Sequence, residues 1–347
     1  MPTMTDVARR AGVAVSTVSY ALNGTRPISE ATRQRIFEAI EELGYKPHAL
    51  ARGLASKRSR LIALLFPSSE RGLGYTELEF VTSAATAAKE NQYNLVLWSY
   101  DVHDLVDLRQ LIQQRLVDGV VVMEVHEHDE RIDLLRKLDF PFSMIGRCAD
   151  ADGLDYVDID FAQTIRDAVD YLAGEGHRRI AFLNQSQAAY DAGYGPVIRT
   201  QAGFEQTMQA RGLEAVSRFC RTAPRAGYEA FAALLDSHPD LTALTTMNER
   251  AVPGVLQAIY DRGWTLPDDF SLEVIVSSGS VAEMMIPPLT TFDAMTVEMG
   301  RLGVELLIEQ LENHPPERSQ ILLPCRLVVR RSSGAAPGGT RSTAQRR

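Results

Sequence analysis

The sequence predicts an all-α head that begins with a helix-turn-helix, followed by a much larger α/β body. Three observations support this division. Two short amphipathic runs meet at Gly12, which is the arrangement of a helix-turn-helix. From residue 61 onward, short apolar runs alternate with longer helical patterns, as in parallel sheets covered by helices on both faces. Charge divides the chain at the same place, because residues 1–60 carry 10 Lys/Arg and 5 Asp/Glu, whereas the remainder carries 26 and 40.

Length and charge place limits on the class of protein. A chain of 347 residues with 45% hydrophobic residues is long enough for two or three domains with buried cores. The net charge of -9 argues against nucleic acid if it is taken whole. A basic head on an acidic body indicates instead that only the head approaches phosphate. The alternative is a solvated surface on which charge is merely uneven.

Cysteine usage and the distribution of apolar residues predict the compartment. Cys148, Cys220 and Cys325 are odd in number and too far apart for a metal site, as is usual for reduced cytosolic residues. No apolar stretch reaches the roughly 18 residues of a membrane span. The N-terminus lacks the apolar core of a signal peptide. We therefore expect a cytoplasmic protein with no membrane contact, no metal and no cofactor.

The first helix of the head is expected to begin after Thr3, with Asp6 three residues further on. A Thr side chain can accept a hydrogen bond from an unpaired amide, and an acidic residue complements the N-terminal end of the helix dipole. A turn follows at residues 11–13, and the second helix is expected to begin near Val15. In a helix-turn-helix this second helix enters the major groove of DNA.

A third helix is expected to run from Ser29, a good N-cap residue, to Gly44. Its apolar face is expected to consist of Ile36, Phe37, Ile40 and Leu43. This face would complete a three-helix core with Val7, Val18 and Leu22, and Tyr45 is expected to pack beside that core.

Two stretches of this region closely resemble the N-terminus of the LacI/GalR family of bacterial repressors. They are TDVARRAGVAVSTVSYALN at residues 5–23 and GYKPHALARGLAS at residues 44–56, and a looser similarity continues to Arg331. The resemblance implies a transcriptional regulator, and specifically a repressor, that binds a pseudo-palindromic operator in double-stranded DNA.

Helix two carries most of the head residues that the resemblance assigns to DNA. It implies three base readers, which are Val15, Ser16 and Tyr20. It implies phosphate contacts, which position the head, at Thr17 and Asn23, and it adds Thr5 to the DNA-binding residues. Many relatives carry Arg where this chain has Tyr20, so the preferred base is expected to differ there. The alternative for each residue is an ordinary exposed helix position.

Residues 47–60 are expected to form a hinge helix and a linker. Such a short helix is marginal in water, and Gly53 weakens it further. In the family, paired hinge helices from two subunits lie in the minor groove at the operator centre, where a leucine wedges open the central base step. The resemblance therefore adds His48, Ala51 and Leu54 to the DNA-binding residues. The alternative is a plain linker.

The body alternates between strand-like runs and helical patterns. Strands are expected at Leu61–Phe66, Leu95–Trp98, Gly119–Met123, Phe142–Ile145, Ile180–Leu183, Leu241–Thr245 and Leu272–Val276. Helices are expected at Glu77–Asn91, Leu105–Leu116, Ala162–Gly174, Gly203–Arg211 and Ala251–Asp261. The resemblance implies a two-lobed sensor like the type I periplasmic binding proteins, with a cleft between the lobes and chain crossovers near Asp160, Thr291 and Leu323.

The resemblance also implies a small-molecule effector, with a sugar or glycoside as the leading class. The residues expected to contact it are Tyr75, Glu124, Arg147, Asp160, Arg199, Asn248 and Ser277. Two anchors of the usual site differ here. The family's R-x-x-G-F motif has Thr200 at its Arg position, with Arg199 one residue early. The family also tends to end a strand in Asp near position 276, where this chain has Val276, Ser277 and Ser278. Asp160 has an alternative role as the cap of the helix expected near Ala162.

The C-terminal region completes the expected domain organisation. Residues 332–347 are rich in Gly, Ser and Ala and are expected to be disordered. Because no leucine-heptad helix follows the body, we expect a homodimer rather than a tetramer. The expected divisions are 1–46 for the head, 47–60 for the hinge, 61–331 for the effector-binding and dimerisation body, and 332–347 for the tail.

Two other classes of function compete with this interpretation. A solute-binding sensor with a degenerate head would need a signal peptide if it were periplasmic, and its head would not keep the TDVA, TVS and LN blocks. An enzyme is disfavoured because the sequence has no nucleophile elbow, P-loop, metal-spaced His/Cys cluster or Rossmann glycine fingerprint. We therefore expect a non-enzymatic, cytoplasmic transcriptional repressor.

Overall fold

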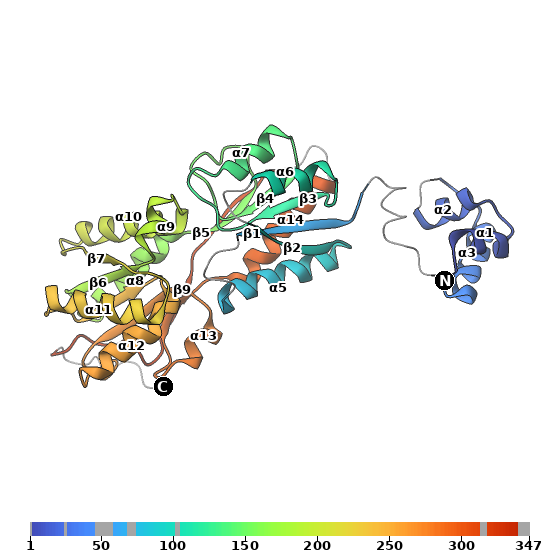
Figure 1. The fold of residues 1–347 in the computed structure, drawn as a ribbon. Coiled ribbons are helices and arrows are strands. Elements are labelled where there is room, and N and C mark those ends of the chain that lie inside the picture. Colours follow the sequence, from blue (N-terminus) through green and yellow to red (C-terminus); the bar gives the residue numbers. More distant parts are fainter. Residues whose placement is uncertain are drawn as a thin grey trace.

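The structure, a computed structural model, consists of a small helical head and a body of two α/β lobes (Figure 1). It describes residues 2–23, 26–45, 58–67, 74–100, 105–312 and 318–338. The predicted fold class, an all-α helix-turn-helix head before a two-lobed α/β body, is confirmed. Among the described residues, no helix is both long and apolar enough to cross a membrane.

The head contains three helices, α1 (Met4–Ala11), α2 (Val15–Asn23) and α3 (Glu30–Leu43). Thr3 caps α1 as expected: the Asp6 amide donates to Thr3 Oγ1 at 3.3 Å, and the Thr3 amide donates to Asp6 Oδ2 at 2.9 Å. Gly12 ends α1 with a φ of 65°, a left-handed conformation that glycine adopts without strain. This residue therefore sets the turn between the two helices of the motif.

The head has its own core, in which Val7, Val18 and Ile36 are fully buried and Tyr45 is nearly so. One expectation for α3 is wrong, because Phe37 is 46% exposed. Successive residues of a helix are separated by about 100° around its axis, so a residue next to Ile36 points away from the face centred on it. Ala39 lies on the buried face instead.

The N-terminal lobe contains a parallel six-stranded sheet in the order β11-β5-β4-β3-β1-β2. Its strands are β1 (Leu61–Pro67), β2 (Asn94–Tyr100), β3 (Gly119–Val122), β4 (Phe142–Ile145), β5 (Tyr156–Ile159) and β11 (Gln320–Leu323). One face packs on α5 (Tyr75–Glu90) and α14 (Thr296–Glu312), the other on α6 (Leu105–Gln113) and α7 (Glu130–Lys137). Both faces are thus covered, which explains the continuous apolar strand runs.

The C-terminal lobe contains a second six-stranded sheet, in the order β12-β10-β9-β8-β6-β7, in which only β12 is antiparallel. Its strands are β6 (Ile180–Asn184), β7 (Val216–Phe219), β8 (Ala243–Thr246), β9 (Ser271–Ser277), β10 (Thr290–Asp293) and β12 (Arg326–Val328). Its helices are α8 (Phe161–Gly174), α9 (Gln187–Asp191), α10 (Gly195–Ala210), α11 (Pro224–Ser237), the 3₁₀ turn η1 (Glu249–Ala251), α12 (Val252–Asp261) and α13 (Gly279–Met284).

The chain passes between the lobes three times. It leaves the first sheet after Ile159, returns between β10 and α14, and crosses again between Leu323 and Arg326. One apolar cluster includes Phe80 and Met299 of the N-terminal lobe and Phe161 of the C-terminal lobe. The lobes therefore share packed side chains beside the crossovers.

Several elements differ from the sequence-based expectation. The strands β5, β7 and β10 have only four residues each and carry polar side chains such as Asp158, Arg218 and Thr291, so no apolar run marks them. Helix α10 begins at Gly195, eight residues before the expected start at Gly203. Proline is favourable in the first turn of a helix, which explains the earlier start beside Pro196.

The expectation that residues 332–347 form a disordered tail is wrong for the first part of that segment. Ser332 is fully buried, its Oγ donates to the Leu272 carbonyl at 2.6 Å, and it accepts from the Thr290 amide at 2.8 Å. Its backbone carbonyl accepts from the Leu272 amide. Small polar residues here serve as hydrogen-bond partners of the sheet, which composition alone does not reveal.

Candidate functional site

The second helix of the head turns its first residues to solvent. Val15 is 42% exposed and Ser16 is exposed, whereas Thr17 and Tyr20 are half-buried and Val18 is buried in the head core. A solvent-facing side at the start of the second helix is the geometry with which helix-turn-helix proteins read the major groove.

The remaining DNA-binding candidates lie in different environments in the structure. Thr5 is exposed on α1. The Tyr20 ring lies against Arg26, whose Cζ is 5.2 Å from the ring centroid, a cation–π contact. Asn23 is the last residue of α2. The hinge candidates His48, Ala51 and Leu54 lie outside the described residues.

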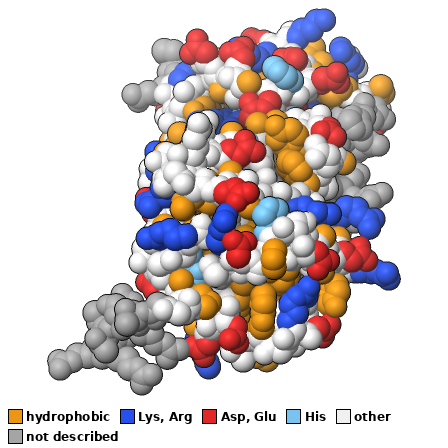
Figure 2. Space-filling model, turned by 90° about the vertical axis from the view of Figure 1, so that its left-hand side faces the viewer, with side chains coloured by type: hydrophobic (Ala, Val, Ile, Leu, Met, Phe, Trp, Pro, Cys, Tyr) orange, Lys and Arg blue, Asp and Glu red, His pale blue; other side chains and the backbone are white. Residues whose placement is uncertain are grey.

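Figure 2 looks at the body from the side of its C-terminal lobe. Acidic and basic side chains are interspersed there, without a continuous basic surface. Nonspecific affinity for DNA comes from basic residues that neutralise phosphates. The excess of basic residues in 1–60 therefore remains the feature of this chain that suits DNA.

A cavity of about 140 Å³ lies between the two lobes. Its apolar wall includes Phe80, Met123, Ile145, Phe161, Tyr194 and Met247. Its charged and amide residues are Glu77, Glu124, Asp158, Gln185, Asn248, Glu249 and Arg250. An apolar wall with a few convergent polar groups is typical of a site for a small molecule.

The structure brings some of the predicted effector residues to this cavity and leaves others away from it. Glu124 and Asn248 line it, and Ser277 lies behind it. Tyr75 is 63% exposed and is outside the described lining, as is Asp160. Asp160 instead caps α8, because its Oδ1 accepts a hydrogen bond from the Gln163 amide. The structure thus favours the alternative role for this residue.

The side-chain amide of Asn248 is oriented by hydrogen bonds from its nitrogen, but its oxygen has no partner among the described residues. Its side chain is 1% exposed, and Nδ2 donates to the Cys220 carbonyl at 2.8 Å and to the Arg221 carbonyl at 3.4 Å. Its Oδ1 is buried and accepts no hydrogen bond from the described residues. A buried acceptor without a partner is costly, so this atom is suited to a ligand that donates a hydrogen bond.

Two carboxyl groups of the cavity wall were not predicted. Burial raises the pKa of Asp158 to about 6, although Arg199 and Arg147 oppose the shift. Burial also raises the pKa of Glu249, against hydrogen bonds from Ser277 and Thr76. The sequence does contain a signal for Asp158, since it is the one charged residue in β5.

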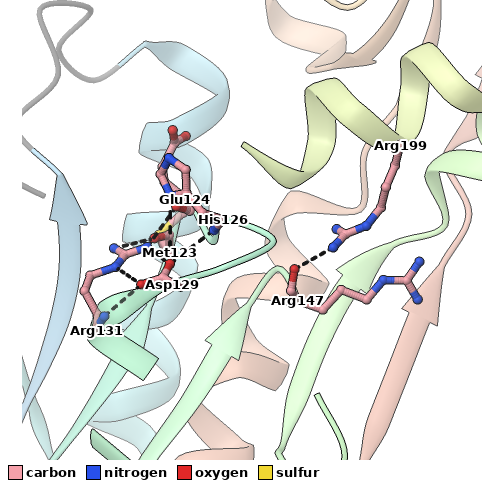
Figure 3. Close-up of polar contacts among 7 residues, drawn as sticks. All are labelled: Met123, Glu124, His126, Asp129, Arg131, Arg147 and Arg199. Carbon is pink, nitrogen blue, oxygen red and sulfur yellow. Dashed lines mark hydrogen bonds and ion pairs between the residues drawn. The ribbon is translucent and has the colours of Figure 1, made fainter. Parts of the chain in front are cut away.

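Arg147 and Arg199 lie close together, at the rim of the cavity rather than in its lining. Arg199 Nη1 is 3.1 Å from Asp158 Oδ2, and Arg147 Nε is 3.5 Å from the same oxygen. Arg199 Nη2 also donates to the Arg147 carbonyl at 2.6 Å (Figure 3). Both arginines therefore reach the cavity wall through Asp158.

The loop that carries Glu124 is held from below by a buried ion pair (Figure 3). Arg131 is 1% exposed, and its guanidinium donates to both carboxylate oxygens of Asp129 and to the Met123 and Glu124 carbonyls. Burial opposes ionisation of Asp129, but hydrogen bonds from Arg131 and His126 lower its pKa overall. Glu124 itself has a φ of 54°, so this support fixes a strained backbone position.

Comparison with known proteins identifies the family. Residues 3–48 match the profile of bacterial regulatory proteins of the lacI family, and residues 169–333 match a periplasmic binding protein-like domain. The ribose operon repressor of Escherichia coli (strain K12) is 30% identical over 345 residues, covering 96% of this chain and 100% of the repressor. The chain belongs to the LacI family. This LacI-family protein is accordingly a DNA-binding transcriptional regulator with an effector-binding domain, and not an enzyme, as the sequence predicts.

Other proteins similar to this LacI-family regulator match 95–96% of the chain. Catabolite control protein A of Priestia megaterium is 28% identical and covers 95% of this chain and 99% of its own length. The structure of the lac repressor dimer bound to operator and the anti-inducer ONPF has a TM-score of 0.81 at 22% identity, covering 96% and 99% of the two chains. The complex of the transcriptional regulator CelR with cellobiose has a TM-score of 0.71 at 27% identity, covering 96% and 100%.

Proposed function

We propose that this regulator represses transcription in the cytoplasm by binding a pseudo-palindromic operator as a homodimer. The observation that carries the proposal is the exposed start of α2 on a basic head, joined to a body with an interlobe cavity. Val15, Ser16 and Tyr20 would read base edges, and Thr5, Thr17 and Asn23 would contact phosphates. His48, Ala51 and Leu54 would contact the operator centre.

Exposed apolar side chains on neighbouring elements support a second copy as the partner. Leu78 on α5 is 47% exposed, Met284 at the end of α13 is 54% exposed, and Ile286 beyond it is 82% exposed. Val297 on α14 is 64% exposed. The helix α5 contacts both α13 and α14, so these side chains are carried by neighbouring elements. A contiguous apolar patch formed by such side chains would suit an interface between two copies.

Selection from random duplex DNA tests the operator proposal. A single recognition helix reads few base pairs, so a dimer should select an inverted repeat whose half-sites lie about one helical turn, or roughly 34 Å, apart. The affinity for the selected site should fall steeply as salt rises. A selection that returns no inverted repeat would contradict the proposal.

We further propose that the effector is a sugar or glycoside bound in the interlobe cavity. The names of two relatives, the ribose operon repressor and CelR with cellobiose, support this class. The wall supports it too, since Asn248 Oδ1 and the carboxylates of Asp158 and Glu249 suit hydroxyl donors. At about 140 Å³ the cavity is small beside the roughly 300 Å³ that begins the usual range for ligands, which favours a compact sugar.

Substitution of Asn248 tests the effector site. Monosaccharides and cellobiose are screened by thermal shift, since a ligand of the native state raises the unfolding midpoint. Asn248→Ala should abolish the shift caused by the active sugar and keep operator binding. Asn184→Ala is the control for the loss of a buried Asn, because Asn184 is fully buried at the end of β6, donates to the Val197 carbonyl, and is outside the described lining. An unchanged shift in folded Asn248→Ala would contradict the assignment.

A further inference from the structure

One arginine ties the two lobes together across the rim of the cavity. Arg199 lies on α10 of the C-terminal lobe. Its guanidinium contacts three acceptors of the N-terminal lobe: Glu127 Oε1 at 2.9 Å, Asp158 Oδ2 at 3.1 Å and the Arg147 carbonyl at 2.6 Å. Figure 3 shows the side chain extending from its helix toward Arg147.

The contacts of Arg199 are sheltered from solvent. The Arg199 side chain is 14% exposed, that of Asp158 is 3% exposed and that of Glu127 is 21% exposed. Ion pairs at the surface contribute little, but removal of one partner from a buried pair leaves an uncompensated charge and is costly. These contacts are largely buried, so their loss should change the free-energy difference between this arrangement of the lobes and one in which the lobes lie further apart.

The acceptors of Arg199 are also held by contacts that do not involve Arg199. The buried Arg131–Asp129 pair fixes the loop that continues to Glu127. The Glu127 amide also donates to the Gly193 carbonyl of the other lobe at 2.8 Å. A planar guanidinium is suited to several acceptors in fixed positions, whereas a lysine ammonium is a single point charge.

The cluster is balanced in charge by residues of the protein itself. Arg147 and Arg199 carry two positive charges, and Asp158 and Glu127 carry two negative charges. The Arg199 guanidinium thus has three protein partners without a ligand, in contrast to the buried Asn248 Oδ1, which accepts no hydrogen bond from the described residues. The partners of Arg199 therefore suit a role in joining the lobes, whereas the unpaired Asn248 Oδ1 suits the binding of an effector.

We propose that Arg199 is an interlobe latch, which holds the two lobes in the arrangement of this structure through contacts of the protein alone. An effector that changes the lobe angle must then compete with Arg199 for Asp158 and Glu127. This second statement rests on the proposed effector site, but the latch itself does not. The latch is therefore tested on the protein without any sugar or operator.

The experiment measures the separation of the lobes directly. Spin labels are attached at Asp133→Cys on α7 and Ala188→Cys on α9, which are exposed positions of different lobes. The native cysteines Cys148, Cys220 and Cys325 are buried, which disfavours their labelling. Electron–electron distance measurements on the labelled full chain then report the interlobe distance and its spread.

Arg199→Met should lengthen and broaden the distance distribution relative to wild type. The matched control is Arg211→Met, which removes the 2.5 Å pair between Arg211 and Asp170, both in the C-terminal lobe, and should leave the distribution unchanged. Glu127→Gln removes the charge from one of the three acceptors and leaves a neutral hydrogen-bond acceptor, so it should give a smaller change than Arg199→Met. If Arg199→Met fails to fold, Glu127→Gln and Arg199→Lys decide the question. A folded Arg199 variant with the wild-type distribution overturns the latch, whatever the outcome of the sugar screen.

Discussion

The Oδ1 atom of Asp160 accepts a hydrogen bond from the Gln163 amide at 2.9 Å and so caps helix α8 directly after the first crossover. Asp160→Ala should lower the free energy of unfolding by about 1 kcal/mol, which is typical of a lost N-cap. Asp160→Ser should retain most of the free energy of unfolding, because the serine hydroxyl can also accept a hydrogen bond from the Gln163 amide. Urea unfolding of the three proteins provides the check, and equal stability of wild type and Asp160→Ala would refute the capping role.

Tyr20 should set the base preference at one position of each half-site. Tyr20→Arg should shift that preference toward guanine, since Arg donates to guanine O6 and N7, with discrimination of about 1–3 kcal/mol. Thr17→Val, at a proposed phosphate contact, should weaken binding to all sites about equally. Binding measured against every base at each half-site position separates the two effects, and an unaltered preference in Tyr20→Arg would exclude Tyr20 as a base reader.

The stability of the protein should depend on pH through Asp158. Burial raises the pKa of Asp158 to about 6 from its ordinary 3.8, against the effect of Arg199 and Arg147. The folded protein thus holds this proton more tightly than the unfolded chain does, and the contribution to stability that is present at low pH is lost as pH rises through about 6.

Relative to Asp158→Asn, which does not titrate, wild type should therefore lose about 1–3 kcal/mol of unfolding free energy between about pH 4 and about pH 6. Unfolding curves for both proteins at several pH values measure this difference. A difference that stays constant over that range, or that grows with pH, is incompatible with a raised pKa.

The start of the C-terminal segment should contribute to the stability of the second lobe. Ser332→Ala removes the hydrogen bonds to the Leu272 carbonyl and from the Thr290 amide, both buried. The loss should be about 1–3 kcal/mol, because buried polar groups are left without partners. A chain that ends at Gly338 keeps both contacts and is the control. Equal melting midpoints for Ser332→Ala and this control would show that the contacts contribute nothing.

The head could be predicted almost completely from the sequence. Its caps, turn and helix positions depend on residues a few places apart, such as Thr3 with Asp6 and the left-handed Gly12. The chemistry of such short-range contacts is visible in the sequence itself. The alternation of strands and helices in the body is also visible in the sequence, since parallel strands covered on both faces need continuous apolar runs. Phe37 was predicted on the buried face of α3 but is exposed, because a shift of one residue turns a side chain by about 100° around the helix.

The cavity, by contrast, was decided by tertiary structure. Asp158 and Arg199 are 41 residues apart on different lobes, and only the crossovers bring their side chains together. The sequence shows that Arg199 is displaced from the usual motif, but not that Asp158 is within its reach. The same holds for Asp160, whose role depends on where α8 begins, and for Ser332, which fits the Leu272 and Thr290 backbone. Local chemistry determines the helices and strands of this protein, whereas the distances between the lobes determine which polar groups are paired and which line the cavity.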